Sequence, residues 1–173
     1  MSLAADPSPL LGQSLIEAMR AADVRVVASV PDICTSEGLL RPIAAEPGLR
    51  LVRVCKEDEG VSICAALAFC GVRSVLLMQQ TGLFDSVNAL RAVAVDYRNP
   101  VCMLVGLLGK EPGVDPRASA RYGVRIVVPL LEVLGIDHRV VRTDADLPEA
   151  FHALDRAYRD SRPLALLLGS EPR

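Results

Sequence analysis

Short apolar runs alternate with amphipathic segments from one end of this chain to the other. The runs are rich in valine and leucine and have the length of buried strands; they cover residues 24–30, 49–54, 72–79, 101–108, 138–142 and 163–168. Helical spacing or capping residues mark the segments between them, at 9–22, 37–45, from Glu59 onward, 83–97, 130–134 and 144–160. This order predicts right-handed crossovers and an α/β fold: a six-stranded, mostly parallel sheet with helices on both faces.

Two local assignments complete this pattern. Residues 124–128 are expected to be a short extended piece, with Pro129 starting the helix that follows, and Asp144 is expected to cap the helix 144–160. Residues 109–123 form a loop rich in proline, glycine and charge, which is long for a compact domain and points to function or mobility.

Composition predicts one domain over residues 1–173, because a chain of this length can bury a sizeable core. Aromatic residues make up only 3%, so the core must be aliphatic, which suits helices packed on a parallel sheet. The net charge is −2 and there is no tryptophan, so neither a basic surface nor a stacking platform for nucleic acid is indicated.

The five cysteines indicate neither a zinc site nor a disulfide framework, since their number is odd and none forms a C-x-x-C pair. Buried free thiols in a reducing compartment are expected. The first residues lack the basic start and apolar run of a signal peptide, and no apolar stretch approaches the length of a membrane span. We therefore expect a cytoplasmic protein with no membrane partner.

Polar residues follow the first three predicted strands, where ligands bind in open parallel sheets. Asp32, Glu59, Gln79, Gln80 and Thr81 are expected to line one crevice there; the alternative is that they only cap helices and form turns. Glu59 precedes small apolar residues, so we expect its carboxylate to enter a packed region where it needs a partner.

The neighbouring acids have a simpler interpretation. Glu57 and Asp58 are interpreted as ordinary carboxylates at an exposed helix start, where the helix dipole favours negative charge.

Several common motifs are missing. No G-x-G-x-x-G follows the first strand, Gly109-Lys110 lacks the rest of a phosphate loop, and His138 and His152 are interpreted as structural or solvent-facing. A dinucleotide site of the usual kind and a Ser-His or Cys-His catalytic pair are therefore disfavoured.

The segments that remain carry a resemblance to a known family. It rests on EGVSICAA (59–66), VLLMQQTGL (75–83) and SVNAL (86–90), with Val30-Pro31, GKEPG (109–113) and PLLEVLGI (129–136) in the same order. This pattern resembles the pyrimidine-binding domain of thiamine-diphosphate-dependent decarboxylases. Within that family it is most similar to the alpha subunit of sulfopyruvate decarboxylase and the matching half of phosphonopyruvate decarboxylase.

The resemblance implies a role for Glu59: in that family this glutamate hydrogen-bonds the N1′ nitrogen of the cofactor's aminopyrimidine, and the cofactor is the electron sink as carbon dioxide leaves. It places the cofactor against seven further residues: Pro31, Asp32, Gln79, Gln80, Thr81, Gly82 and Leu83. Glu57 is the competing candidate for the role of Glu59. Gln80-Thr81 and Phe84-Asp85 replace the family's asn-ser and gly-asn, which bears on the substrate and on whether the activity is retained.

The chain contains no Gly-Asp-Gly, the family's motif for the diphosphate and magnesium. The resemblance therefore implies a partner, a beta-type subunit carrying Gly-Asp-Gly and a downstream Asn, which holds Mg²⁺ and shares thiamine diphosphate with this chain. We expect a hetero-oligomer that also self-associates and decarboxylates a small 2-oxo acid. The alternatives are a non-catalytic or regulatory subunit and an unrelated α/β ligand-binding domain.

Sulfopyruvate and phosphonopyruvate carry a second anion. Lys110 and Arg117 are the predicted substrate-binding cations, with Arg121 and Arg125 on the same segment. The planar guanidinium of an arginine can bind a sulfonate or phosphonate through two parallel hydrogen bonds. The alternative is that these residues are solvated surface charges.

Overall fold

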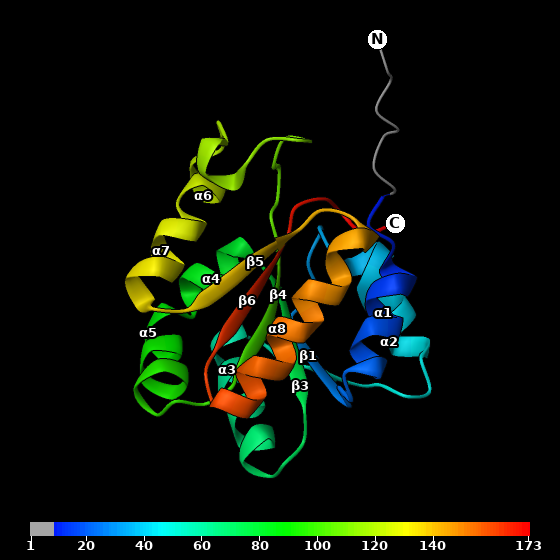
Figure 1. The fold of residues 1–173 in the computed structure, drawn as a ribbon, viewed down its shortest axis with the longest axis vertical. Helices are drawn as coiled ribbons and strands as arrows, with labels where there is room; N and C mark the ends of the chain where they lie inside the picture. The colour runs from blue at the N-terminus through cyan, green and yellow to red at the C-terminus, as the bar shows by residue number, and fades with distance from the viewer. Residues whose placement is uncertain (1–8) are drawn as a thin grey trace.

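The computed structural model describes residues 9–173, and its centre is one six-stranded sheet (Figure 1). Its strand order is β2-β1-β3-β4-β6-β5, and every neighbouring pair is parallel. The strands are β1 (Val26–Ser29), β2 (Arg50–Arg53), β3 (Ser74–Gln79), β4 (Cys102–Gly106), β5 (Asp137–Val141) and β6 (Leu164–Leu168). The predicted α/β class is thus confirmed.

Helices cover both faces of this sheet, as predicted. One face packs against α1 (Gly12–Ala21), the π-helical turn η1 (Ser36–Leu40), α2 (Arg41–Ala45) and α8 (Leu147–Asp160). The other packs against α3 (Glu57–Phe69), α4 (Gln80–Asp85), α5 (Val87–Ala89), the π-helical segment η2 (Leu90–Asp96) and α7 (Val127–Leu134). Alternate strand residues reach the two layers: Leu77 and Leu104 point to the first, and Leu76 and Met103 to the second.

The segment 124–128 is helical, so the expectation of an extended piece there is wrong. Its residues close α6 (Tyr122–Arg125) and open α7, and Pro129 is the third residue of α7. A short valine-rich run has no periodicity of its own, and burial of Val124, Val127 and Val128 accounts for its composition. Proline is tolerated there because the first helical turn leaves its N–H groups unpaired.

Two other predicted elements differ in detail. The helix expected at 83–97 begins earlier, at Gln80, and is interrupted at Ser86 between α4 and α5. The loop 109–123 contains a 3-10 turn, η3 (Pro116–Ala118), and the start of α6.

Asp144 does not cap the helix that follows it. Its carboxylate accepts hydrogen bonds from Leu11 N (2.9 Å) and Ser14 Oγ (2.7 Å), and so fixes the start of α1. Asp146 instead accepts from Arg142 N (2.7 Å) and Thr143 N (3.0 Å) at the turn η4 (Asp144–Asp146) before α8.

The first and last described segments lie together (Figure 1). Gly12 N donates to Arg173 O at 2.9 Å, and Arg173 N donates to Leu10 O at 3.1 Å. Pro9 also forms a β-bridge with Thr143. Between residues 9 and 173, no helix combines the length and apolar character that crossing a bilayer requires.

Candidate functional site

The site forms where the direction of strand connection reverses. The chain leaves β1 toward β2 on one side and returns to β3 on the other, so β1 and β3 are neighbours whose following loops diverge. In parallel sheets such a switch point opens a crevice at the carboxyl ends of the strands. The predicted site segments 31–36, 55–59 and 79–85 follow β1, β2 and β3, so they meet at this edge.

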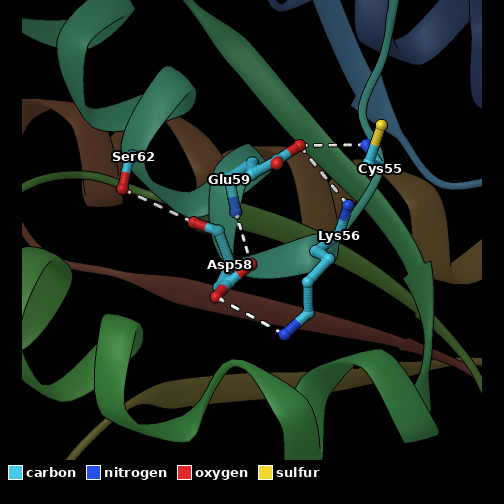
Figure 2. A network of polar contacts seen from close by, with 5 residues as sticks. All are labelled: Cys55, Lys56, Asp58, Glu59 and Ser62. Atoms are coloured by element: carbon cyan, nitrogen blue, oxygen red, sulfur yellow. Dashed lines mark hydrogen bonds and ion pairs between the residues drawn. The ribbon is translucent and has the colours of Figure 1, made fainter.

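Glu59 lies in the first turn of α3, and the backbone ahead of the helix holds its carboxylate (Figure 2). Oε2 accepts hydrogen bonds from Cys55 N at 2.9 Å and, more weakly, from Lys56 N at 3.4 Å. This is one half of a capping box; a lysine side chain has no acceptor and cannot supply the other. Asp58 supports the same turn by accepting from Glu59 N at 2.9 Å, and it pairs with the Lys56 ammonium at 3.9 Å.

Glu59 is exposed, so the expectation that it enters a packed region is wrong for this chain on its own. The residues after it, Gly60 and Val61, face the sheet instead. Within residues 9–173, the second oxygen Oε1 accepts no hydrogen bond. The result is a carboxylate with fixed orientation and one oxygen available to a ligand.

Glu57, expected at an exposed helix start, is half-buried. Its side chain lies directly over Gly82 in α4, where a Cβ would overlap the carboxylate. The sequence signal that could have indicated this is Gly82 itself, because a glycine inside a helix costs stability and usually has a packing reason. Glu57 and Glu59 belong to one helical turn, but the Glu57 carboxylate faces α4 and the Glu59 carboxylate is exposed.

Polar contacts join the ends of β1 and β3. The Gln79 amide donates to Thr81 Oγ1 at 2.7 Å, and the buried Cys34 thiol donates to Gln79 Oε1 at 3.8 Å. Burial, together with the charge of Asp32, raises the pKa of Cys34 to about 12, so this thiol stays protonated at neutral pH. Cys34 is a residue of this edge that the sequence analysis did not single out.

The remaining predicted cofactor residues differ in how exposed they are and in their hydrogen bonds. Pro31 is exposed, and Asp32 accepts from Thr35 N (2.9 Å) and Thr35 Oγ1 (2.7 Å), which makes it a turn-forming residue. Gly82 is buried beneath Glu57, and the Leu83 side chain is fully buried in the core. Of these residues, Pro31 and Asp32 lie on the accessible side of the edge.

The Gln80 side chain points inward. Its Oε1 accepts from Leu108 N at 2.7 Å and its Nε2 donates to Leu108 O at 3.3 Å, so the amide joins α4 to the segment after β4. The residue is only 5% exposed, and both ends of the amide are used within the chain.

The structure does not bring Lys110 and Arg117 together. Arg117 is half-exposed and forms an ion pair with Glu132 on α7. Lys110 Nζ donates to Glu111 O at 2.9 Å and lines a cavity shared with the ends of β5 and β6. Arg125 donates to Ser119 O at 2.8 Å, and Arg121 lies beside Gly109.

Beyond Ser62, the exposed and half-buried residues of α3 are all apolar. Ala66 is exposed, Ile63 is half-buried, and Phe69 at the end of the helix is 92% exposed. This outer face of α3 begins one turn beyond Glu59.

Comparison with known proteins shows relatives that match nearly the whole chain, although no family model matches. The alpha subunit of sulfopyruvate decarboxylase from Methanothermobacter thermautotrophicus is 31% identical over 157 residues, which span 90% of this chain and 93% of that one. The corresponding subunit from Methanocaldococcus jannaschii is 25% identical, over 89% and 90% of the two chains. Sulfopyruvate decarboxylase from Methanosarcina acetivorans is 28% identical, but the match covers only 38% of that longer chain.

A solved structure shows the same fold. It is a thiamine diphosphate-dependent 4-hydroxybenzoylformate decarboxylase from Rhodococcus jostii RHA1, with a TM-score of 0.66 and 16% identity. The match covers all of this chain and 35% of that one. The resemblance stated from sequence motifs is thus confirmed: the chain belongs to the family of sulfopyruvate decarboxylase alpha subunits.

Proposed function

We propose that this chain is the alpha-type subunit of a two-chain thiamine-diphosphate-dependent decarboxylase. Its substrate would be sulfopyruvate or a similar dianionic 2-oxo acid. The observation that carries the proposal is Glu59, held by two backbone N–H groups with one oxygen available at the carboxyl edge of the sheet. The position of this residue in a chain that is 31% identical to a sulfopyruvate decarboxylase alpha subunit supports the assignment.

The chemistry of Glu59 fits the aminopyrimidine of thiamine diphosphate. A carboxyl group can share a proton with the ring nitrogen N1′, and the N–H groups of Cys55 and Lys56 hold it in place while it does so. The cofactor would also contact residues at the ends of β1 and β3, namely Pro31, Asp32, Gln79 and Thr81. When bound, the cofactor supplies the electron sink that accepts the electrons of the breaking carbon–carbon bond.

A partner subunit would complete the site. Among residues 9–173 no cluster of three metal-ligating side chains exists, and the sequence has no Gly-Asp-Gly, so we assign the diphosphate and Mg²⁺ to the partner. The relatives named as alpha subunits support this division. The apolar outer face of α3 beside Glu59 is the surface we propose for the partner, because docking there would also cover the carboxylate.

Covering Glu59 has a chemical consequence. Its exposed carboxylate is hydrated in the free chain, and excluding that water would strengthen its bond to N1′. Arg117 is the cation that we keep for the substrate's second anion, since its ion pair with Glu132 is exposed and can be exchanged. Lys110 faces a separate cavity at the ends of β4, β5 and β6.

The test is Glu59→Gln in the assembled two-chain complex. This change keeps the size of the side chain and removes the acidic proton, so exchange of the cofactor's C2 hydrogen, followed by NMR, should slow by about a hundredfold or more. Unfolding by urea and assembly with the partner should be little changed.

Glu57→Gln is the matched control, since it removes a carboxylate from the same helical turn. It should leave C2 exchange within a few-fold of the parent. If the C2 hydrogen in the Glu59→Gln complex exchanged at the parental rate, Glu59 would not have the assigned role. Loss of exchange only in Glu57→Gln would transfer that role to Glu57. A complex in which neither substitution changes a measurable activity would favour the alternative of a non-catalytic subunit.

A further inference from the structure

A cavity of about 750 Å³ opens at the carboxyl ends of β4, β5 and β6, on the other half of the sheet edge. These ends lie at the top of the view in Figure 1. Four glycines line the cavity, so their backbone is accessible to a ligand. Its charged wall includes Lys110 after β4 and Arg142 after β5, with Glu171 and Arg173 from the last segment.

Among residues 9–173, no carboxylate lies within ion-pair distance of the Lys110 ammonium. Its ammonium donates to Glu111 O, but the Glu111 carboxylate is turned away, accepting from Ser119 Oγ at 2.6 Å and Ala120 N at 3.0 Å. Burial lowers the pKa of Lys110, and the nearby positive charge of Arg142 lowers it further, while the charges of Glu111 and Asp115 oppose this shift without cancelling it. The ammonium is therefore partly desolvated beside a like charge.

Arg142 is held in place by packing of its stem and by hydrogen bonds of its backbone. Its aliphatic stem packs on Gly169, where a Cβ would lie 3.0 Å from Arg142 Cγ. The backbone on either side is fixed, since Arg142 N donates to Asp146 and Arg142 O accepts from Ser170. The carboxylate of Asp115 lies 3.6 Å from Nη2, at ion-pair distance, and the guanidinium is half-exposed.

We propose that Lys110 and Arg142 form a binding site for a small dianionic organic acid that bears a sulfonate or phosphate group. Two cations that face one cavity repel each other, and an anion between them removes that repulsion. The planar guanidinium binds a tetrahedral oxyanion with two parallel hydrogen bonds, while the ammonium adds a point charge. The glycine backbone allows the ligand to approach closely.

This site goes beyond the proposed function because Glu59, Gln79 and Thr81 do not line the cavity. Glu59 follows β2 and Arg142 follows β5, the two outermost strands of the sheet. Cys34 forms part of the wall between the two places, lining the cavity while its thiol contacts Gln79.

The test uses the full chain alone, without partner or cofactor, and sulfoacetate as the probe. In ¹⁵N NMR titrations at constant ionic strength, saturable one-to-one shifts should appear in the backbone signals of Gly109 and Gly169. Lys110→Met and Arg142→Gln should each weaken binding about tenfold or more, because each removes a charge-assisted hydrogen bond. Arg139→Gln is the control, since Arg139 lies on β5, pairs with Asp137 at 2.7 Å, and does not line the cavity.

Three results would overturn the proposal: shifts that never saturate, equal weakening in Arg139→Gln, or shifts confined to residues around Glu59. If Lys110→Met fails to fold, Arg142→Gln and Arg142→Lys decide, with Lys expected to retain part of the affinity. Glu59→Gln should bind sulfoacetate like the parent. An inactive complex that still binds the probe would therefore contradict the decarboxylase assignment and leave this site standing.

Discussion

Gln80 illustrates how one side chain at a strand end can serve the fold instead of a ligand. Its amide satisfies both the N–H and the C=O of Leu108, two backbone groups at the point where the chain leaves the sheet. Buried backbone groups need such partners, because leaving one unpaired costs about 1–3 kcal/mol. The residue type expected to face a cofactor therefore connects α4 to the end of β4.

We expect Gln80→Ala to lower the free energy of unfolding by about 2 kcal/mol, since it leaves the Leu108 N–H without a partner. Urea unfolding followed by circular dichroism measures this. Gln13→Ala is the control: Gln13 is exposed, and among residues 9–173 its side chain bonds only to Glu17, so its loss should cost under about 0.5 kcal/mol. Equal effects of the two substitutions would mean that the hydrogen bonds between Gln80 and Leu108 contribute little to stability.

At this scale the sequence predicts where polar residues lie but not which way they point. The polar segments predicted to follow the first three strands do follow β1, β2 and β3, because the ends of strands can be predicted from the ends of apolar runs. Direction depends on partners far along the chain: Gln80 meets Leu108, and Asp144 meets Leu11 and Ser14. The exposure of Glu59 depends on the helical phase of α3, which a stretch of uniformly small residues does not reveal.

Among the elements, α3 and α4 are coupled through Glu57 and Gly82. The half-buried carboxylate lies over the third residue of α4, and the lack of a side chain at Gly82 makes room for it. The two helices carry Glu59 and the residues after Gln79, so this contact fixes one side of the candidate site relative to the other.

A double-mutant cycle measures this coupling. In the parent, Gly82→Ala should be neutral or destabilising, since the new methyl group displaces Glu57. In the Glu57→Ala background the same change should stabilise by up to about 1 kcal/mol, the usual helix preference for alanine. Urea unfolding of all four proteins gives the interaction energy, expected at about 0.5–2 kcal/mol. Additive effects would show that the two side chains do not interact.

The elements that were predicted well are those with an unambiguous pattern. All six strands and the amphipathic α1 and α8 were expected near their observed places, because long periodic segments carry the clearest signal. Residues 124–128 were assigned wrongly because a short run of valines and isoleucine is equally compatible with a strand and with a buried helix. Tertiary burial on the sheet decided between them.

The whole molecule buries several groups that must stay uncharged. Burial raises the pKa of Cys34 to about 12 and that of Cys64 to about 11, from an ordinary value near 9. Burial also raises the pKa values of Cys102 and Tyr158. The folded state thus keeps protons that the unfolded chain releases first as the pH rises.

Raised pKa values of buried thiols make the folded state less stable as the pH rises above about 9. Below about pH 9 both states hold these protons, so their contribution is fully present; above it the unfolded state is favoured. We expect the free energy of unfolding to fall between about pH 9 and 11, by about 1.4 kcal/mol per pH unit for each buried thiol. Cys64→Ala should reduce this slope, and Cys70→Ala, at an exposed thiol, should not. If Cys64→Ala and the parent showed the same pH dependence of the free energy of unfolding, the raised pKa assigned to Cys64 would be wrong.

The hydrogen bonds of Arg173 with Leu10 and Gly12 place the first and last described residues side by side. A peptide linker of a few residues could therefore join them without crossing the sheet. New termini could then be opened at Gly71, an exposed turn residue with φ of +73° that joins α3 to β3. In such a circular permutant, β3 would become the first strand of the chain while the strand order in space stayed the same.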